Sequence, residues 1–215
     1  MAVGAGAAVV FVEYDRSPEA RYPVAIEQGY ATARWITEHG ADEGLEASRL
    51  AVAGDSASEN PAVRALVYVA GFAPDAGETA FQLSEKFEGS TLGAALAAYP
   101  VATGGNEFRI ADDKFHHQFC ADLDAGEAAL MAATQRPVTE RALTDDLNVG
   151  EAPWRVKPSW FVYGERDLNI PAEVVRFMAQ RASSRGTREI AGASHAIAVS
   201  QPDAVAASIR DAVSG

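Results

Sequence analysis

The chain has 215 residues and a mass of 22.7 kDa, and 48% of its residues are hydrophobic, so it is long enough to bury a core. Its 30 acidic residues outnumber its 18 basic ones. The resulting formal net charge of -12 repels phosphate backbones and anionic membrane surfaces. We therefore expect one compact domain and no nucleic-acid partner.

The cysteine content and the amino-terminal residues bear on the compartment. Cys120 is the only cysteine, which excludes an intrachain disulfide and fits a reducing environment. The segment Met1–Val12 has neither a basic stretch nor a cleavage-site pattern, so we expect no signal peptide. No stretch approaches the roughly 20 apolar residues of a membrane-spanning helix. These features favour a cytoplasmic protein.

Short apolar runs alternate with helical patterns along the chain. Buried strands are predicted over Ala8–Val12, Leu50–Ala53, Ala65–Ala70, Ser159–Tyr163 and Arg188–Ile190. Helices are predicted over Val24–His39 with Gly40 as its carboxyl cap, along the face formed by Val174, Phe177, Met178 and Arg181, and over about Pro202–Val213. Strands that alternate with helices predict an α/β fold with a mostly parallel, doubly wound sheet.

The interval 74–158 breaks this alternation. It carries helical patterns over Thr79–Phe87, Asp112–Asp122, Asp124–Gln135 and Pro137–Leu143, and we predict no strand in it. We interpret 1–73 and 159–215 as the core and 74–158 as a helical cap inserted between two strands. Such caps cover active sites and shape substrate pockets.

A candidate nucleophile lies directly after the strand Leu50–Ala53. In Gly54-Asp55-Ser56-Ala57-Ser58, the strand context allows Ser56 to sit on a sharp turn with its hydroxyl exposed above the sheet. A serine hydroxyl is a poor nucleophile by itself. It needs a base within hydrogen-bond reach and an acid that fixes the tautomer of that base.

Candidates for both partners lie downstream, each after a predicted strand. Asp167 follows the strand that ends at Tyr163, with Glu165 as its nearest rival, and His195 lies in the turn after Ile190. Ligand-binding residues of open α/β sheets gather outside the carboxyl ends of the strands. The sequence therefore predicts that Ser56, Asp167 and His195 meet at one edge of the sheet.

Several motifs resemble α/β-hydrolases, in two pieces. Tyr14-Asp15-Arg16-Ser17-Pro18-Glu19 and Ala51-Val52-Ala53-Gly54-Asp55-Ser56-Ala57 resemble the hormone-sensitive-lipase branch over about residues 7–60. From about Val63 onward, the segments 66–74, 163–171 and 192–195 resemble small esterase-like hydrolases with a helical cap. The chain order serine, acid, histidine is also that of α/β-hydrolases.

The resemblance implies a serine esterase or lipase that acts on a small-molecule ester without a cofactor. Ser56 would be the nucleophile, His195 the general base and Asp167 the acid that orients it. The backbone N–H of Ala57 would donate to the oxyanion of the tetrahedral intermediate.

Three departures from the family pattern surround Ser56. Ser58 stands where the family has glycine. Only residues 54–64 separate Ala53 from Ala65, whereas a parallel crossover with its helix needs about a dozen residues or more. The family's His-Gly-Gly-Gly segment is absent, so we expect a sheet truncated at its amino-terminal side and a second oxyanion donor that is missing or supplied by the backbone of 3–7. We hypothesise a fusion or internal deletion near residue 60.

Apolar side chains of the cap are candidates for the substrate pocket. We expect Phe81, Phe115, Phe119 and Trp154 to line a pocket for short to medium chain esters. No metal is expected, because His116 and His117 are adjacent on a helix and face different directions. Cys120 lies in the same helical pattern and is interpreted as a packing residue.

A second reading remains open. The chain could be a hydrolase fold retained for binding or self-association. Missing strands would leave an unpaired sheet edge, through which two copies could form a homo-oligomer under either reading.

Overall fold

The computed structural model provides a partial description of the chain. It describes residues 8, 10, 12, 15, 24–46, 51–54, 63–100, 105–146 and 151–215. Residues 9 and 11 of the predicted strand Ala8–Val12 lie outside the described residues, as do Ser56 and Ala57, and no strand is assigned at residues 8, 10 and 12.

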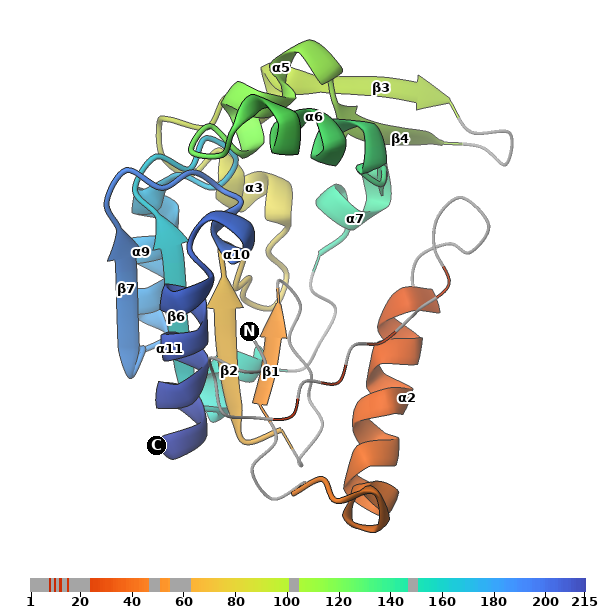
Figure 1. The fold of residues 1–215 in the computed structure, drawn as a ribbon, viewed down its shortest axis with the longest axis vertical. Coiled ribbons are helices and arrows are strands. Elements are labelled where there is room, and N and C mark those ends of the chain that lie inside the picture. The colour runs from red at the N-terminus through yellow and green to blue at the C-terminus, as the bar shows by residue number, and fades with distance from the viewer. Residues whose placement is uncertain are drawn as a thin grey trace.

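Among the described residues, a parallel sheet of four strands lies at the centre of the fold (Figure 1). Its order is β1 (Ala51–Gly54), β2 (Ala65–Val69), β6 (Ser159–Gly164) and β7 (Gly186–Ile190). All neighbouring pairs are parallel. The four corresponding predictions are confirmed with shifts of one or two residues at the ends. The parallel order places all carboxyl ends at one edge, which is where the loops after β6 and β7 meet.

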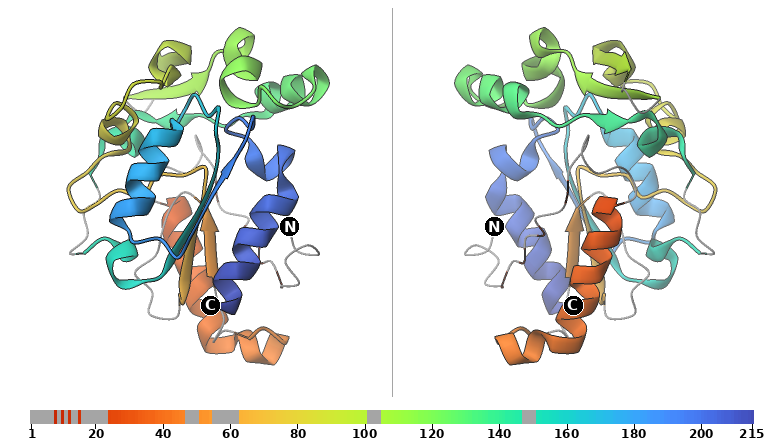
Figure 2. Two further views of the ribbon diagram at one scale, coloured as in Figure 1. Left: turned by 90° about the vertical axis from the view of Figure 1, so that its left-hand side faces the viewer. Right: turned by 90° about the vertical axis from the view of Figure 1, so that its right-hand side faces the viewer.

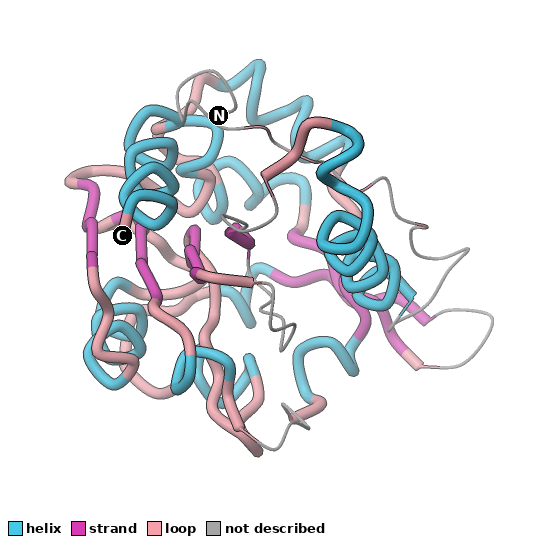
Figure 3. Tube along the Cα trace, turned by 90° about the horizontal axis from the view of Figure 1, so that it is seen from below, coloured by secondary structure: helices cyan, strands magenta, loops and turns pink. Residues whose placement is uncertain are grey.

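Helices cover both faces of this sheet. The helices α9 (Ala172–Arg181) and α11 (Pro202–Ser214) lie on opposite sides of the strands (Figures 2 and 3). The strand β6 is buried at every residue, and β2 is buried at every residue except Val69, whereas the outer strand β7 is half-buried or exposed along its length. This explains why β6 has a continuous apolar run rather than alternating polar and apolar residues.

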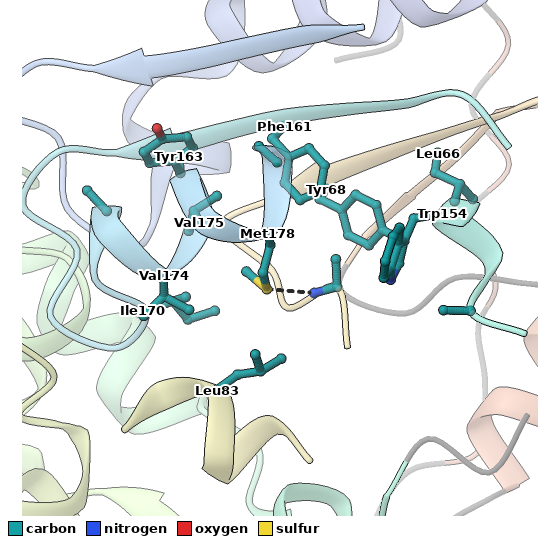
Figure 4. Close-up of a cluster of buried hydrophobic side chains, with 14 of the residues drawn as sticks. Leu66, Tyr68, Leu83, Trp154, Phe161, Tyr163, Ile170, Val174, Val175 and Met178 are labelled. Atoms are coloured by element: carbon teal, nitrogen blue, oxygen red, sulfur yellow. Dashed lines mark hydrogen bonds between the residues drawn. The ribbon is translucent and has the colours of Figure 1, made fainter. Parts of the chain in front are cut away.

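The larger core lies on the α9 side of the sheet (Figure 4). Tyr68 of β2 stacks on Phe161 of β6 with ring centroids 4.6 Å apart, and Met178 of α9 packs beside them. Met178 Sδ also accepts the backbone N–H of Ala73 at 3.1 Å. Each fully buried side chain of this size contributes about 1.5–3 kcal/mol of transfer free energy, so this cluster fixes α9 and the strands as one unit.

The interval 74–158 lies between β2 and β6, which are neighbours in the sheet. Its elements α5, α6, β3 and β4 lie beyond the carboxyl ends of the main strands (Figure 1). Its helices are α3 (Ala80–Ser84), α4 (Leu92–Ala95), α5 (Asp112–Phe119), α6 (Ala125–Thr134), α7 (Glu140–Thr144) and α8 (Pro153–Val156). The limits of the cap as a unit, 74 and 158, remain a prediction.

The expectation of an interval without strands was wrong. It contains an antiparallel sheet of β3 (Leu96–Pro100), β4 (Asn106–Ile110) and β5 (Val138–Thr139). The alanines around 94–98 favour a helix in isolation, but Leu96 pairs with Ile110 and Pro100 with Asn106. Pairing with a distant segment therefore outweighs the local propensity.

The amino-terminal helix α2 spans Val24–His39, as predicted. Its carboxyl end differs from the prediction at Gly40. The chain continues as a short 3₁₀-helix, Gly40–Glu43, and the left-handed cap is Gly44, with φ 74°. No helix in the described part of the chain is long and apolar enough to cross a membrane.

Candidate active site

Asp167 lies in the loop that follows β6, and its side chain is fully buried. Its Oδ1 atom accepts the backbone N–H of Asn169 at 2.8 Å and that of Ile170 at 2.9 Å. These two donors fix the orientation of the carboxylate and leave Oδ2 for another partner. A buried carboxylate needs such partners because its desolvation is costly.

The loop after β7 brings His195 to the same place. The backbone N–H of Arg166 donates to Ala193 O at 2.9 Å, which ties this loop to the one that carries Asp167. The loop passes so close to the end of β6 that a Cβ on Gly164 would lie 2.2 Å from Ser194 O. Gly164 is therefore the residue that allows the two loops to approach each other.

Asp167 and His195 form a direct hydrogen bond. His195 Nδ1 lies 2.7 Å from Asp167 Oδ2, and the imidazole side chain is 18% exposed. When Nδ1 carries the proton and donates to the carboxylate, the lone pair of the neutral ring is on Nε2. In the part of the chain that the structure describes, Nε2 has no hydrogen-bond partner. This arrangement suits a base that takes a proton through Nε2.

Glu165, the rival acid, has a different role. Its Oε2 atom accepts the backbone N–H of Gly192 at 2.8 Å, and the residue is exposed. It therefore stabilises the turn that precedes His195. Of the two carboxylates that the sequence offered, the structure pairs Asp167 with the histidine.

One predicted pocket residue, Phe119, lies beside His195, and a second, Phe115, packs behind it. The Phe119 ring meets the imidazole edge to face, with centroids 4.9 Å apart. Phe115, one turn earlier on α5, stacks on Phe119 at 5.0 Å and is buried. Phe119 O also accepts the backbone N–H of Ala196 at 3.0 Å. Helix α5 thus supplies an aromatic ring on one side of the imidazole.

The other two predicted pocket residues lie elsewhere. Phe81 is 47% exposed on α3. Trp154 is buried in the main core with Leu66, near the amino end of β6, and its indole N–H donates to Pro74 O at 2.9 Å (Figure 4). Asp167 and His195 follow the carboxyl ends of their strands, so Trp154 is not brought together with them. The indole ring of this tryptophan fills part of the core, and its N–H is satisfied by a backbone carbonyl.

A polar network behind Asp167 was not predicted from the sequence. Gln118 of α5, which is 3% exposed, donates from Nε2 to Leu168 O at 3.0 Å and to Asn169 Oδ1 at 2.8 Å. Its Oε1 atom accepts the hydroxyl of Thr91 at 2.8 Å. Because these residues are far apart in the chain, no motif links them.

The residues beside α5 have altered acidities. Burial, together with the nearby Asp122, raises the pKa of the Cys120 thiol, which is fully buried and unsuited to act as a nucleophile. Burial opposes the ionisation of Asp122, but hydrogen bonds, led by the one from Ser194, lower the pKa of that carboxyl overall. Ser194 directly precedes His195, so Asp122 helps to hold the histidine loop.

Ser56 and Ala57 lie outside the described residues. The strand β1 ends at Gly54, which is level with Tyr68 in β2, and Tyr68 is level with Phe161 in β6. The chain therefore leaves β1 at the edge where Asp167 and His195 lie. Residues 55–64 join β1 to β2, whereas a three-turn helix alone needs about 11 residues. The hypothesis of a junction near residue 60 remains a prediction.

A metal centre is not supported within the described ranges. No group of three His, Cys, Asp or Glu residues there could hold a metal ion. His116, one of the adjacent histidines, places Nε2 2.9 Å from Leu123 O, which satisfies that nitrogen within the cap.

Comparisons with known proteins identify the family. The chain belongs to the alpha/beta hydrolase fold family, whose sequence model matches residues 1–199. This confirms the predicted fold class and the resemblance stated above.

Curated relatives match a quarter of the chain. Esterase LipI of Mycobacterium tuberculosis is 55% identical over 56 residues, which are 26% of this chain and 18% of LipI. Carboxylesterase NlhH of the same species is 51% identical over 59 residues, or 27% of this chain and 18% of NlhH. The matched segment thus spans less than a fifth of these relatives.

Solved structures share the fold over most of the chain. A Pyrobaculum calidifontis esterase has a TM-score of 0.55 and 20% identity, with 98% of this chain and 67% of that chain covered. Carboxyl esterase 2 of Tuber melanosporum has a TM-score of 0.57 and 19% identity, with 99% and 70% covered. At these identities the likeness concerns the fold alone.

Proposed function

We propose that the chain is a carboxylic ester hydrolase that works through an acyl-enzyme on Ser56, with His195 as general base and Asp167 as the orienting acid. The observation that carries the proposal is the buried hydrogen bond from His195 Nδ1 to Asp167 Oδ2, in a member of the alpha/beta hydrolase fold family. The relatives named esterase and carboxylesterase support esters as the substrate class.

The proposed reaction has two stages. His195 Nε2 takes the proton of Ser56 Oγ while Oγ attacks the ester carbonyl, and the imidazolium then protonates the departing alcohol. In the second stage, His195 takes a proton from water as the water oxygen attacks the acyl carbonyl. The bond between the acyl carbon and Ser56 Oγ then breaks, the imidazolium returns its proton to Oγ, and the carboxylic acid leaves. The Asp167 carboxylate stabilises the imidazolium that forms in each stage. The chemistry requires no cofactor.

The oxyanion hole is the least complete part of the proposed site. The N–H of Ala57 would donate one hydrogen bond to it, and the backbone of 3–7 is our candidate for the second. The loss of one such donor typically costs about a hundred- to a thousandfold in rate. Esters with activated leaving groups are the suitable probes.

The Phe119 ring beside the imidazole, with Phe115 packed behind it, supports an acyl pocket for short to medium chains. The chain-length preference is measurable with p-nitrophenyl acetate, butyrate and palmitate. A kcat/KM that is highest for the long-chain palmitate would contradict this part of the proposal.

The test compares the wild type with Ser56→Ala and with the matched control Ser58→Ala, two residues further along the chain. Ser56→Ala is expected to lower turnover of p-nitrophenyl acetate by about a thousandfold or more, whereas Ser58→Ala retains most of it. A serine-directed phosphonate is expected to label Ser56. Equal turnover by the wild type and Ser56→Ala would refute the proposal.

The second candidate is a non-catalytic hydrolase fold that self-associates. It is favoured by the position of β1, which has a strand on one side only among the described residues. A folded wild type that neither hydrolyses the ester nor reacts with the phosphonate, and that elutes as a dimer in size-exclusion chromatography, would support this candidate instead.

A further inference from the structure

The cap helix α5 contacts the loops of both Asp167 and His195. On one side, Gln118 is bonded to the loop after β6. On the other side, Phe119 O accepts Ala196 N–H, and Ser194 donates its hydroxyl to Phe119 O at 3.2 Å and to Asp122. One short helix therefore connects the two halves of the acid–base pair.

Both polar atoms of the Gln118 side-chain amide form hydrogen bonds. Its oxygen accepts the Thr91 hydroxyl, and its nitrogen reaches Leu168 O and Asn169 Oδ1. Leu168 O also accepts the backbone N–H of Thr91 at 3.1 Å. A buried amide with all of these partners rigidifies its surroundings, since loss of any one leaves a buried polar group unpaired.

This network ends at the carboxylate of Asp167. Gln118 donates hydrogen bonds to Leu168 O and Asn169 Oδ1. The backbone N–H groups of Asn169 and Ile170 are the donors to Asp167 Oδ1. The position of these N–H groups sets the rotation of the carboxylate. That rotation in turn decides whether Oδ2 points at His195 Nδ1.

We propose that Gln118 is a positioning residue: from the cap, it holds the 168–170 loop so that the Asp167 carboxylate fixes the tautomer and orientation of His195. The inference rests on the proposed function of the same pair. It predicts that the loss of the Gln118 amide lowers kcat much more than it changes KM, because the residue acts on the base and not on the substrate.

The decisive variant is Gln118→Met, which keeps the length and volume of the side chain and removes its hydrogen bonds. The matched control is Gln135→Met. Gln135 also lies in the 74–158 interval and bridges to the backbone, with Oε1 3.0 Å from Ile110 N and Nε2 2.8 Å from Ile110 O, and among the described residues it has no hydrogen bond to either loop of the pair. Both variants lose hydrogen bonds between a glutamine side chain and the protein.

Two readouts separate positioning from a general loss of stability. The first is kcat and KM for p-nitrophenyl acetate. The second is the NMR resonance of the His195 Nδ1 proton in protein labelled with ¹⁵N-histidine, assigned by its absence in His195→Ala. We expect Gln118→Met to lower kcat by about ten- to a hundredfold and to broaden the Nδ1 proton resonance. Gln135→Met is expected to leave both unchanged, at a comparable loss of melting temperature.

The proposal is overturned if Gln118→Met keeps the wild-type kcat and Nδ1 resonance, or if Gln135→Met changes them equally. If Gln118→Met does not fold, Thr91→Val decides in its place. It removes only the hydroxyl donor to Gln118 Oε1 and should produce a smaller change in both readouts, so an unchanged resonance would count against the proposal.

The NMR readout needs no turnover, which keeps the two proposals apart. If the wild type and Ser56→Ala hydrolyse the ester equally, the proposed function fails, while a broadened Nδ1 resonance in Gln118→Met still supports positioning of the pair. If Ser56→Ala abolishes turnover and the resonance is unaffected by Gln118→Met, only the positioning role fails.

Discussion

Two clusters lie at opposite ends of the main sheet. Each contains an acid, a basic or cationic group and an aromatic ring. At the carboxyl end, Asp167 accepts from His195 at 2.7 Å, and the Phe119 ring lies 4.9 Å from the imidazole. The acid is fully buried, whereas the imidazole is partly exposed. One imidazole nitrogen is occupied, and the other has no partner among the described residues.

At the amino end, Arg181 takes the place of the histidine. Its guanidinium donates to Glu78 at 2.6 and 2.9 Å and to Ala73 O at 2.7 Å, and it lies 5.0 Å from the Trp154 ring. A guanidinium stays protonated at all relevant pH values. This cluster therefore joins α9 to the chain after β2 and has no proton to exchange.

The contrast shows that a carboxylate paired with a basic side chain can serve structure or chemistry. Which of the two it suits depends on whether the basic side chain keeps a nitrogen that can take up a proton. His195 combines a fixed orientation with a nitrogen that has no partner in the described part of the chain, and Arg181 combines several donors with a permanent charge. Substitutions at the carboxyl end should therefore lower kcat or displace His195, whereas a substitution at the amino end should lower only the free energy of unfolding.

The largest expected effect is that of Asp167→Asn on activity. Because the amide would donate to Nδ1 and place the proton of the imidazole on Nε2, we expect kcat for p-nitrophenyl acetate to fall by about 10⁴-fold. Glu165→Gln is the control, because its partner is Gly192 N–H, and it should change kcat only slightly. A similar loss in both variants would show that the contrast between the two carboxylates is wrong.

An intermediate effect is expected at Gly164, where the carboxyl-end loops meet. Gly164→Ala places a methyl group 2.2 Å from Ser194 O, and we expect it to lower the free energy of unfolding by about 3 kcal/mol and to displace His195. Gly93→Ala is the control, since it meets nothing within 4 Å in α4, and we expect it to stabilise by roughly 0.5–1 kcal/mol. Urea denaturation measures both. Equal stabilities would contradict the close approach of the loops.

The smallest effect is expected at the amino end. The hydrogen bonds from Arg181 hold the pKa of Glu78 below its usual range. Their contribution is therefore present above the pKa of the unfolded chain and is lost as pH falls through the lower pKa of the folded state. We expect Glu78→Gln to lower the free energy of unfolding by about 1 kcal/mol at pH 7, with no change in kcat.

The difference in stability between Glu78→Gln and the wild type should shrink in acid, as measured by urea denaturation between pH 7 and pH 3. A fall in kcat at pH 7 would instead assign the amino-end cluster a part in the chemistry. That result would contradict a purely structural role for the pair of Glu78 and Arg181.

The main sheet was accessible to sequence reasoning for a simple physical reason. Strands such as Ser159–Gly164 are buried on both faces, so their apolar runs are continuous and end at glycine. Asp167 and His195 could then be predicted together, because the residues that follow parallel strands share an edge. The length of α2 was equally clear from its periodicity.

The missed features depend on contacts between distant segments. Strand β3 owes its conformation to β4, although its own alanines favour a helix. Gln118 is a polar residue in a helical pattern, and only the fold shows that it faces Leu168 and Asn169. Trp154 was assigned to a pocket from its size and its place in the interval, but the packing of α8 against Leu66 puts it in the core.

The insertion of residues 70–158 between two neighbouring strands has a consequence for the order of folding. Strands β6 and β7 are close in the chain, whereas β2 pairs with β6 only after a long loop has been closed. The entropy of loop closure and the dependence of folding rate on contact order both delay such distant pairings. During refolding, we therefore expect amides of β7 to gain protection from hydrogen exchange before those of β2. The helix that joins the acid and histidine loops, α5, lies within this late-closing segment, so the geometry of the base would be completed near the end of folding.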